Sequence, residues 1–316
     1  MSTQRREGAA LALTALLLLA AACEPAAPPL RIMAASSLRD VMEQLAARYE
    51  AEHPGSSVRV ETGGSVVLAR RVRELAVEVD LLFLADASLF GELLEPDWTS
   101  FHLRYATDRL VLAYTEESVG AASIDEESWP EVIADPRATI AMADPSLAPV
   151  GYRTLAVLRL YDLLHPGRDL EDMVVAKVGA RHLRANVADL LAPLQAGAVD
   201  YAFLYAATAA AAGLRVVELS TRINLGELRL APVYARVAID LGDGRPPRPA
   251  GVVVYGVSVP DRGPARSEAL EFLRLALDPA GRQTLVDRGL KPVRGDDRAV
   301  GFGLPAGVED VLAGTR

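Results

Sequence analysis

Two junctions near the start of the chain constrain its fold most strongly. They are RIMAASSL at residues 31–38 and VRVETGGSV at residues 58–66. Each runs from a short extended segment through small residues into a predicted helix that opens with a serine. The first N–H groups of a helix lack partners and carry partial positive charge, and a serine hydroxyl adds another donor. Two such helix starts facing one cleft would bind a small oxyanion rather than convert it.

The rest of the chain continues the alternation of strand-length apolar segments with helical spacing. The predicted strands are residues 32–35, 58–60, 80–84, 110–114, 139–142, 201–205, 216–219 and 252–259. The predicted helices are residues 38–49, 67–75, 129–134, 151–164, 187–195, 267–276 and 280–287, and residues 241–250 are expected to form a flexible loop. This alternation predicts an α/β fold with mostly parallel sheets.

The order of these segments predicts two α/β lobes, with the chain crossing twice between them and a hinged ligand cleft in between. The expected division is a signal peptide at 1–22, a tether at 23–30, the first lobe at 31–112, the second lobe at 113–235, a return to the first lobe at 236–298 and a C-terminal tail at 299–316.

The first 23 residues have the organisation of an export signal. Arg5 and Arg6 precede an apolar run at residues 9–19, which is too short to span a bilayer stably. Three alanines then precede Cys23, a pattern that resembles the lipobox of bacterial lipoproteins. We expect cleavage before Cys23, lipid attachment to its thiol and an exported protein at the cell membrane or in the periplasm. The alternative is a plain secretory signal with an incidental cysteine.

Charge and cysteine content narrow the possible functions. The formal net charge is −9, which argues against nucleic acid as a partner. Any anion site must therefore be local, built from helix starts and hydroxyls. Because Cys23 is the only cysteine, no disulfide can form within the chain. We expect a monomer with no cofactor and no metal site.

A series of short motifs in order resembles the molybdate/tungstate-binding proteins of ABC importers, with the later motifs most similar to the archaeal-type branch. The motifs are ASSL at 35–38, GSVVLARR at 64–71, VD to AD across 79–86, VLAYTE at 111–116, PVGYR at 149–153, DY to Y across 200–205, INLG at 223–226 and VYGVSVP at 254–260. The resemblance covers about residues 31–293.

The resemblance implies the two-lobed fold of type II periplasmic binding proteins and a tetrahedral oxyanion, molybdate or tungstate, held between the lobes. Partners implied in the same way are an ABC permease and its ATPase. By resemblance, Ser37 and Ser65 would donate hydroxyl and backbone N–H groups from the first lobe. Val150 and Val187 would donate backbone N–H groups at helix starts, and Tyr205 would donate its phenol.

The chain departs from the archaeal-type branch at two carboxylates that approach the metal of the anion. Ser146, Leu147 and Ala148 stand where the first is expected, and Arg222 where the second is expected. Asp144 and Glu218 are close in sequence but out of register. We therefore expect tetrahedral recognition. Arg222 either enters the cleft, which would broaden the range of oxyanions, or lies on the surface.

Simpler interpretations remain for the same residues. Ser37 and Ser65 could be helix N-caps, the usual role of a serine before a helix. Tyr205 could be a core residue, Asp86 is expected to bond loop amides, and Tyr152 and Arg153 could pair between the lobes.

Enzyme function is disfavoured because no serine, histidine and acid occur in a catalytic arrangement, and GGSVV at 63–67 lacks the second glycine of a nucleophile elbow. The four histidines do not have the spacing of metal ligands. Only His182, near Asn186, is kept as a candidate functional histidine. Alternative functions are a carrier for sulfate, phosphate or another oxyanion, and a sensing or interaction lipoprotein of the same fold.

Overall fold

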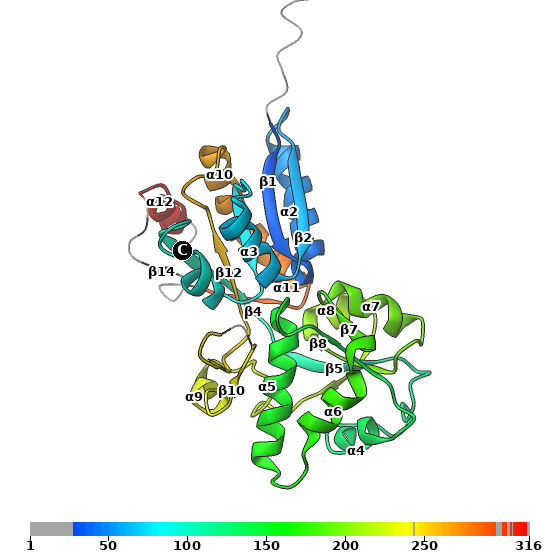
Figure 1. Ribbon diagram of the computed structural model, residues 1–316. Helices are drawn as coiled ribbons and strands as arrows, with labels where there is room; N and C mark the ends of the chain where they lie inside the picture. The colour runs from blue at the N-terminus through cyan, green and yellow to red at the C-terminus, as the bar shows by residue number, and fades with distance from the viewer. Residues whose placement is uncertain (1–27, 243, 295–298, 302–303, 305, 315–316) are drawn as a thin grey trace, which may run out of the picture.

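The computed structural model describes residues 28–242, 244–294, 299–301, 304 and 306–314. The predicted signal peptide and Cys23 lie outside these residues. The described chain forms two large β-sheets in separate bodies, each flanked by helices, and a small two-stranded sheet, with the chain running between the bodies (Figure 1). The α/β fold with two lobes, predicted from the sequence, is confirmed.

The first sheet has seven strands and forms the core of the upper body in Figure 1. Its strands are, in spatial order, β13 (Lys291–Pro292), β4 (Phe101–Thr107), β12 (Val254–Ser258), β3 (Leu81–Leu84), β1 (Leu30–Ala35) and β2 (Val58–Gly63), with β14 (Ala299–Gly301) also paired to β4. Its helices are α2 (Arg39–Glu52), α3 (Ser65–Leu75), α10 (Arg266–Leu277), α11 (Pro279–Asp287) and α12 (Ala306–Gly314), with the short helical turns η1 (Ser36–Leu38) and η2 (Phe90–Leu94).

The second sheet has five strands and lies in the lower body. Its order is β7 (Leu183–Arg184), β6 (Ile140–Ala143), β8 (Tyr201–Tyr205), β5 (Leu110–Tyr114) and β9 (Arg215–Glu218). Around it lie α4 (Trp129–Ala134), α5 (Pro149–Leu164), α6 (Leu170–Val178), η3 (Ala180–His182), α7 (Ala188–Gln195) and α8 (Ala206–Ala211). A two-stranded sheet of β10 (Ala238–Ile239) and β11 (Arg248–Pro249) accompanies η4 (Leu228–Leu230) and α9 (Ala231–Tyr234).

The hydrophobic pattern explains why these elements form where they do. In α2 the buried side chains include Val41, Met42, Leu45 and Tyr49, the helical spacing seen in the sequence. Strands β3, β5, β6 and β8 are buried along their whole length, as expected of strands covered on both faces. The Ala-rich segment after β8 is α8, because alanine has the highest helix propensity.

Both sheets are mixed rather than mostly parallel. Strand β1 runs parallel to β2 and β3, and β6 runs parallel to β7 and β8. Strands β12 and β5, however, pair antiparallel with their neighbours. Both follow connections that come from the other body, so neither is reached through the helical crossover that makes consecutive strands parallel. Periodicity along the chain indicates each strand but not the direction in which it enters the sheet.

The chain changes sheet between Thr107 and Leu110, whereas the sequence analysis ends the first lobe at residue 112. It returns to the first sheet at β12. Segment 241–250, expected to be a flexible loop, instead contains β11, which pairs with β10. In the segment expected to be a tail, β14 pairs with β4 and α12 packs on α10. None of the helices in the described part of the chain is long and apolar enough to cross a membrane.

Candidate functional site

The five residues expected to bind the anion line one small cavity between the two bodies. Ser37 and Ser65 come from the first body, whereas Val150, Val187 and Tyr205 come from the second. The cavity has a volume of about 10 Å³, room for about one water molecule. Its remaining lining residues are Ala35, Ser36, Gly63, Gly64, Ala85, Ala148 and Pro149. An anion would have to widen the cavity by a small separation of the bodies.

Three helix starts contribute to this cavity. Ser65 is the first residue of α3, Val150 is the second residue of α5 and Val187 precedes α7. Ser37 lies in η1, which leads directly into α2. Because the N–H groups of a first helical turn lack partners within the helix, these starts direct backbone donors and positive dipole ends to one place.

The cavity hydroxyls have hydrogens with no acceptor among the described residues. Ser37 Oγ is buried and makes no hydrogen bond to another described residue within normal distance and angle, and the Tyr255 hydroxyl lies close enough to it to be affected by it. Ser65 Oγ accepts a hydrogen bond from the Ala85 N–H at 2.9 Å, and Tyr205 Oη accepts one from Arg153 Nη1 at 2.8 Å. Buried polar groups are normally satisfied, so three hydroxyl hydrogens without a protein acceptor around one cavity indicate that a water molecule or an anion accepts them there. For Ser37 and Ser65 this goes beyond an N-cap role, since neither caps its helix through its side chain.

Tyr205 is a neutral donor over the physiological pH range. Burial raises the pKa of Tyr205 to about 12, although Arg153 opposes the shift. Its neighbour Tyr255 has a hydroxyl that is also buried without a hydrogen-bond partner. Burial raises the pKa of Tyr255 well above its usual value, and the nearby Ser37 opposes this. The cavity is therefore surrounded by hydroxyls that keep their protons.

Two glycines allow the backbones at this site to approach closely. A side chain on Gly64 would place its Cβ 2.6 Å from the Leu147 carbonyl oxygen of the other body. A Cβ on Gly151 would lie 2.3 Å from the Ala143 carbonyl oxygen, where α5 begins beside the end of β6. Both glycines have ordinary backbone angles, so the need for glycine here is one of space. Gly64 of the GSVV motif thus brings the two bodies together at the cavity, whereas Gly151 of the PVGYR motif lets α5 begin close to β6 within the second body.

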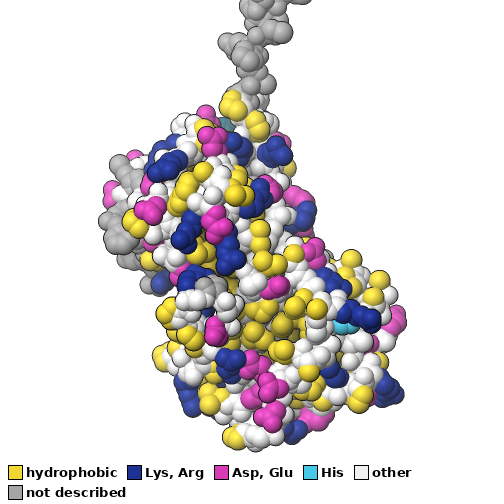
Figure 2. Space-filling model, in the orientation of Figure 1, with side chains coloured by type: hydrophobic (Ala, Val, Ile, Leu, Met, Phe, Trp, Pro, Cys, Tyr) yellow, Lys and Arg dark blue, Asp and Glu magenta, His cyan; other side chains and the backbone are white. Residues whose placement is uncertain are grey.

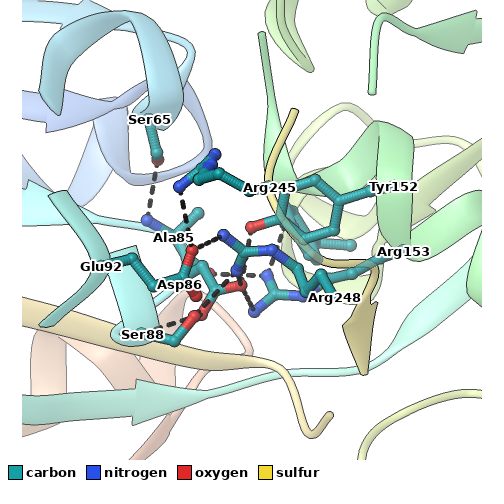
Figure 3. A network of polar contacts seen from close by, with 10 residues as sticks. Ser65, Ala85, Asp86, Ser88, Glu92, Tyr152, Arg153, Arg245 and Arg248 are labelled. Atoms are coloured by element: carbon teal, nitrogen blue, oxygen red, sulfur yellow. Dashed lines mark hydrogen bonds and ion pairs between the residues drawn. The ribbon is translucent and has the colours of Figure 1, made fainter. Parts of the chain in front are cut away.

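A charged cluster lies next to the cavity (Figure 3). Asp86 follows β3 in the first body and accepts hydrogen bonds from Tyr152 Oη at 2.6 Å and from Arg248 Nη1 at 3.1 Å. Arg153 Nη2 lies 3.4 Å from the same carboxylate, and Ser88 donates to its other oxygen at 2.8 Å. The sequence-based expectation that Tyr152 and Arg153 pair between the lobes is confirmed, and Asp86 bonds more than loop amides.

Opposing effects act on the pKa of Asp86. Burial alone would raise it, but the Arg153 and Arg248 guanidinium groups outweigh burial and hold the pKa below its usual value. At Glu92, which pairs with Arg248, burial prevails and raises the pKa. Asp86 is thus an ionised carboxylate. Tyr152 and Arg153 from the second body and Arg248 from β11 surround it.

Arg222, the residue left open by the sequence, is exposed and does not line the cavity. Of the two carboxylates close in sequence to the expected positions, Glu218 pairs with Arg109, and Asp144 accepts hydrogen bonds from Ser146. No carboxylate lines the cavity as described. The lining therefore presents hydroxyls, helix-start N–H groups and small apolar groups, and no negatively charged side chain.

The histidines lie elsewhere. His102 pairs with Glu95 at 2.6 Å, and His53 stacks on Tyr49. His182 has a buried Nδ1 without a partner, and burial with nearby Arg184 lowers its pKa, but it does not line the cavity. Across the described ranges, no group of three His, Cys, Asp or Glu side chains could hold a metal ion.

Sequence reasoning missed Ala85 and the role of Arg153 behind the cavity. Ala85 lines the cavity and bonds to Ser65 through its N–H, and its carbonyl accepts from Arg153 Nη1 at 2.6 Å. The sequence did contain one indication of this role, because Arg153 is a charged residue at the fifth position of α5, whose first turns are otherwise uncharged. Its partners are 68 and 52 residues away in the chain, so the signal identified no contact.

Comparison with known proteins gives the family. The family described as bacterial extracellular solute-binding protein matches residues 30–291. The molybdate/tungstate-binding protein WtpA of Pyrococcus abyssi is 30% identical over 266 residues, which cover 77% of each chain.

Solved structures give the same fold. The periplasmic molybdate-binding protein of Azotobacter vinelandii is similar with a TM-score of 0.61 at 18% identity, covering 84% of this chain and 100% of that one. The sulfate-binding protein SubI of Mycobacterium tuberculosis has a TM-score of 0.58 at 12% identity, covering 92% of each.

Proposed function

The chain belongs to the bacterial extracellular solute-binding proteins, and from this premise we propose that it captures a tetrahedral oxyanion, molybdate or tungstate, between its two bodies. In this proposal the closed protein delivers the anion to an ABC permease driven by its ATPase. The observation that carries the proposal is that the hydroxyl hydrogens of Ser37, Ser65 and Tyr205 surround one cavity and have no acceptor among the described residues. The 30% identical relative named for molybdate and tungstate supports the choice of anion.

The chemistry of the lining suits a dianion. Hydrogen bonds to a charged acceptor are shorter and stronger than neutral ones, and donors fixed on helix starts keep their arrangement within each body while the bodies separate slightly to admit the anion. Donors from both bodies would close on the same ligand, so the closed form gains contacts that the open form lacks. Size would then separate molybdate and tungstate from sulfate and phosphate, because a ring of fixed donors satisfies one radius best.

Calorimetric titration of the chain from residue 24 onward with molybdate, tungstate, sulfate and phosphate tests this proposal. We expect tight binding of the first two anions and weak binding of the others. Preference for sulfate would keep the site and change the transported anion, in line with the absence of carboxylates from the cavity. No binding of any of the four would contradict the proposal and favour a sensing or interaction role.

We further propose that the protein is exported and anchored to the membrane through a lipid on Cys23. The support is the sequence pattern of positive, apolar and small residues before this cysteine. In a cell fractionation experiment, Cys23→Ser should move the protein from the membrane to the soluble fraction. Persistent membrane association of the variant would contradict lipid anchoring at this residue, with an unaltered chain as the control.

A further inference from the structure

A second pocket, of about 480 Å³, is bordered by the charged cluster and shares no lining residue with the cavity of Ser37 and Ser65. Its walls come from η2, β4 and β12 of the first body, from α5 of the second and from the β10–β11 segment. Pockets that bind small organic molecules have volumes of about 300–1,000 Å³. The second pocket therefore has the size for an organic ligand, which the cavity of about 10 Å³ lacks.

Arg248 of β11, in the charged wall of this pocket, has one guanidinium hydrogen that no described residue accepts. Its side chain is 12% exposed and lies over the Tyr152 ring, with the guanidinium carbon 4.7 Å from the ring centre. Nη1 donates to Asp86 at 3.1 Å and to Ser88 at 2.8 Å, and Nη2 donates to Glu92 (Figure 3). Nε is buried and has no acceptor among the described residues. These contacts fix the guanidinium, so an acceptor for Nε has to come to it.

Arg104 brings a second guanidinium to the same pocket. His102 and Arg104 lie two residues apart on β4 and both line the pocket, because alternate side chains of a strand share one face. Tyr105, between these two faces in register, instead packs on Phe83 in the core. Arg104 is exposed, and its guanidinium makes no hydrogen bond or ion pair with a described residue. It can therefore move onto a ligand.

Each of the three acids in the lining already has a basic partner. The pairs are Asp86 with Arg153 and Arg248, Glu92 with Arg248, and Glu95 with His102. The charge left without a partner in the lining is that of Arg104. One unpaired cation matches the single charge of a carboxylate. A phosphate monoester would bring a second negative charge into a wall that contains Asp86 and Glu92.

Much of the remaining wall is apolar. It includes Ala156, Leu225, Ile239, Ala250, Val252 and Val254. Gly251 lies in the same wall and leaves open space where a Cβ would stand. Burial of this surface favours a ligand with an apolar body, whereas a bare oxyanion would leave it against water.

We propose that the second pocket binds a small organic carboxylate with an apolar body. The carboxylate accepts a hydrogen bond from Arg248 Nε and pairs with Arg104, and the apolar body lies against the wall of α5 and the segment from β11 to β12. This is a second ligand site, and it does not depend on the capture of an oxyanion in the cavity.

Calorimetric titration of the protein with octanoate tests the proposal. Octylammonium has the same chain with the opposite charge, and acetate has the head without the apolar body. We expect saturable binding of one octanoate, and no saturable binding of octylammonium or acetate. Saturating molybdate should not displace octanoate, because the cavity and the second pocket have no lining residue in common.

Two variants at the exposed Arg104 test the position of the head without disturbing the core. Arg104→Gln should weaken octanoate about fivefold, because a charge pair at a partly exposed site contributes about 1 kcal/mol. Arg104→Glu should weaken octanoate further and strengthen octylammonium. Arg59→Glu, at an exposed arginine on β2 of the same sheet, is the matched control and should change neither affinity.

Several outcomes would overturn this site. Equal octanoate affinities of Arg104→Glu and Arg59→Glu would remove the head from Arg104, and equal binding of octanoate and octylammonium would remove the selection by charge. No binding of octanoate would mean that the pocket holds water only. Displacement of octanoate by molybdate would assign the carboxylate to the cavity. Oxyanion capture is measured with molybdate alone, so the first three outcomes leave the proposed function intact.

Discussion

Two neighbouring regions between the bodies are built from the same elements yet differ in how their polar groups are used. The cavity takes Ala85 from the end of β3 and Val150 from the start of α5, and the charged cluster takes Asp86 and Tyr152, one and two residues further along. In the cavity, hydroxyls keep hydrogens that no described residue accepts. In the cluster, the carboxylate of Asp86 receives several donors.

The difference teaches how to separate a ligand site from a structural contact. Charged groups that already have their partners hold the two bodies together. Buried hydroxyls whose hydrogens have no acceptor instead indicate where a ligand would bind. Figure 2 shows positive and negative side chains mixed over the visible face, so charge on that face does not distinguish the two regions. The hydrogen bonds of the buried oxygens do distinguish them, because the Asp86 carboxylate accepts several and the Ser37 hydroxyl makes none, although Arg248 Nε in the cluster also has no partner among the described residues.

The largest effect is expected from breaking the charged cluster. Asp86→Asn leaves the buried Arg153 without its carboxylate and Arg248 with only Glu92, and it should lower the free energy of unfolding by about 3–5 kcal/mol. Urea unfolding measures this loss. Glu92→Gln is the control, because Glu92 is 36% exposed and should cost less than about 1 kcal/mol. Equal stability of the two variants would show that the cluster contributes no more than a surface pair.

The next effect concerns Asp108, a buried carboxyl at the crossing between the sheets that bonds only to the backbone N–H groups of Arg109 and Ala207. Burial raises the pKa of Asp108 to about 6, despite these bonds. A raised carboxyl pKa stabilises the fold below the usual value and loses that stabilisation as the pH rises through the folded value. We expect this residue's contribution to fall by about 2–3 kcal/mol as the pH rises from about 4 to about 7.

Urea unfolding across that pH range tests the prediction for Asp108, with Asp108→Asn as the comparison. The variant should lose this part of the pH dependence. Asp86 should act with the opposite sign, because its lowered pKa adds stability that is lost only as the pH falls below the usual carboxyl range. An identical pH profile for wild type and Asp108→Asn would contradict the assignment.

At the cavity, Ser37→Ala should reduce molybdate affinity by about 10- to 100-fold, because a hydrogen bond to a charged group contributes about 1.5–3 kcal/mol. Since Ser37 Oγ makes no hydrogen bond in the empty protein, the unfolding free energy should stay nearly unchanged. Calorimetry and urea unfolding measure the two quantities. Ser57→Ala, at an exposed serine of the same body, serves as the control. If Ser37→Ala instead lowered stability and left molybdate affinity unchanged, Ser37 would have a structural role and the proposed cavity would not be the binding site.

The smallest effect is expected at a groove of about 210 Å³ that adjoins the cavity through Ser36 and Ser37. Exposed Arg39 lines this groove, and its charge should attract an approaching dianion. In stopped-flow measurements, Arg39→Glu should slow association about two- to fivefold at low salt and have no effect at high salt, where the charges are screened. Arg168→Glu, at an exposed arginine in the turn after α5, is the matched control. Equal rates for both variants would contradict this approach route.

Much of the fold and the lining of the cavity could be predicted from the sequence. The periodicity of residues 38–49 and 110–114 identified α2 and β5, because these elements bury one face or both. Ser37, Ser65, Val150, Val187 and Tyr205 do line one cavity. Their binding of an anion stays a prediction. The sequence did not predict the direction of the strands, the existence of β11 or the pairing of Arg248. Each of these depends on a segment that packs against it from elsewhere in the chain.

The sequence by itself determined the alternation of strands and helices, the serine at each of two helix starts and the lack of bulk positive charge, since these follow from local propensity and composition. The exposure of Arg222, the convergence on Asp86 and the link from Arg153 through Ala85 to Ser65 were decided by the tertiary structure alone. The physical reason is that a hydrogen bond depends on distance and direction. Both are set only when two segments, often more than 50 residues apart, are packed together.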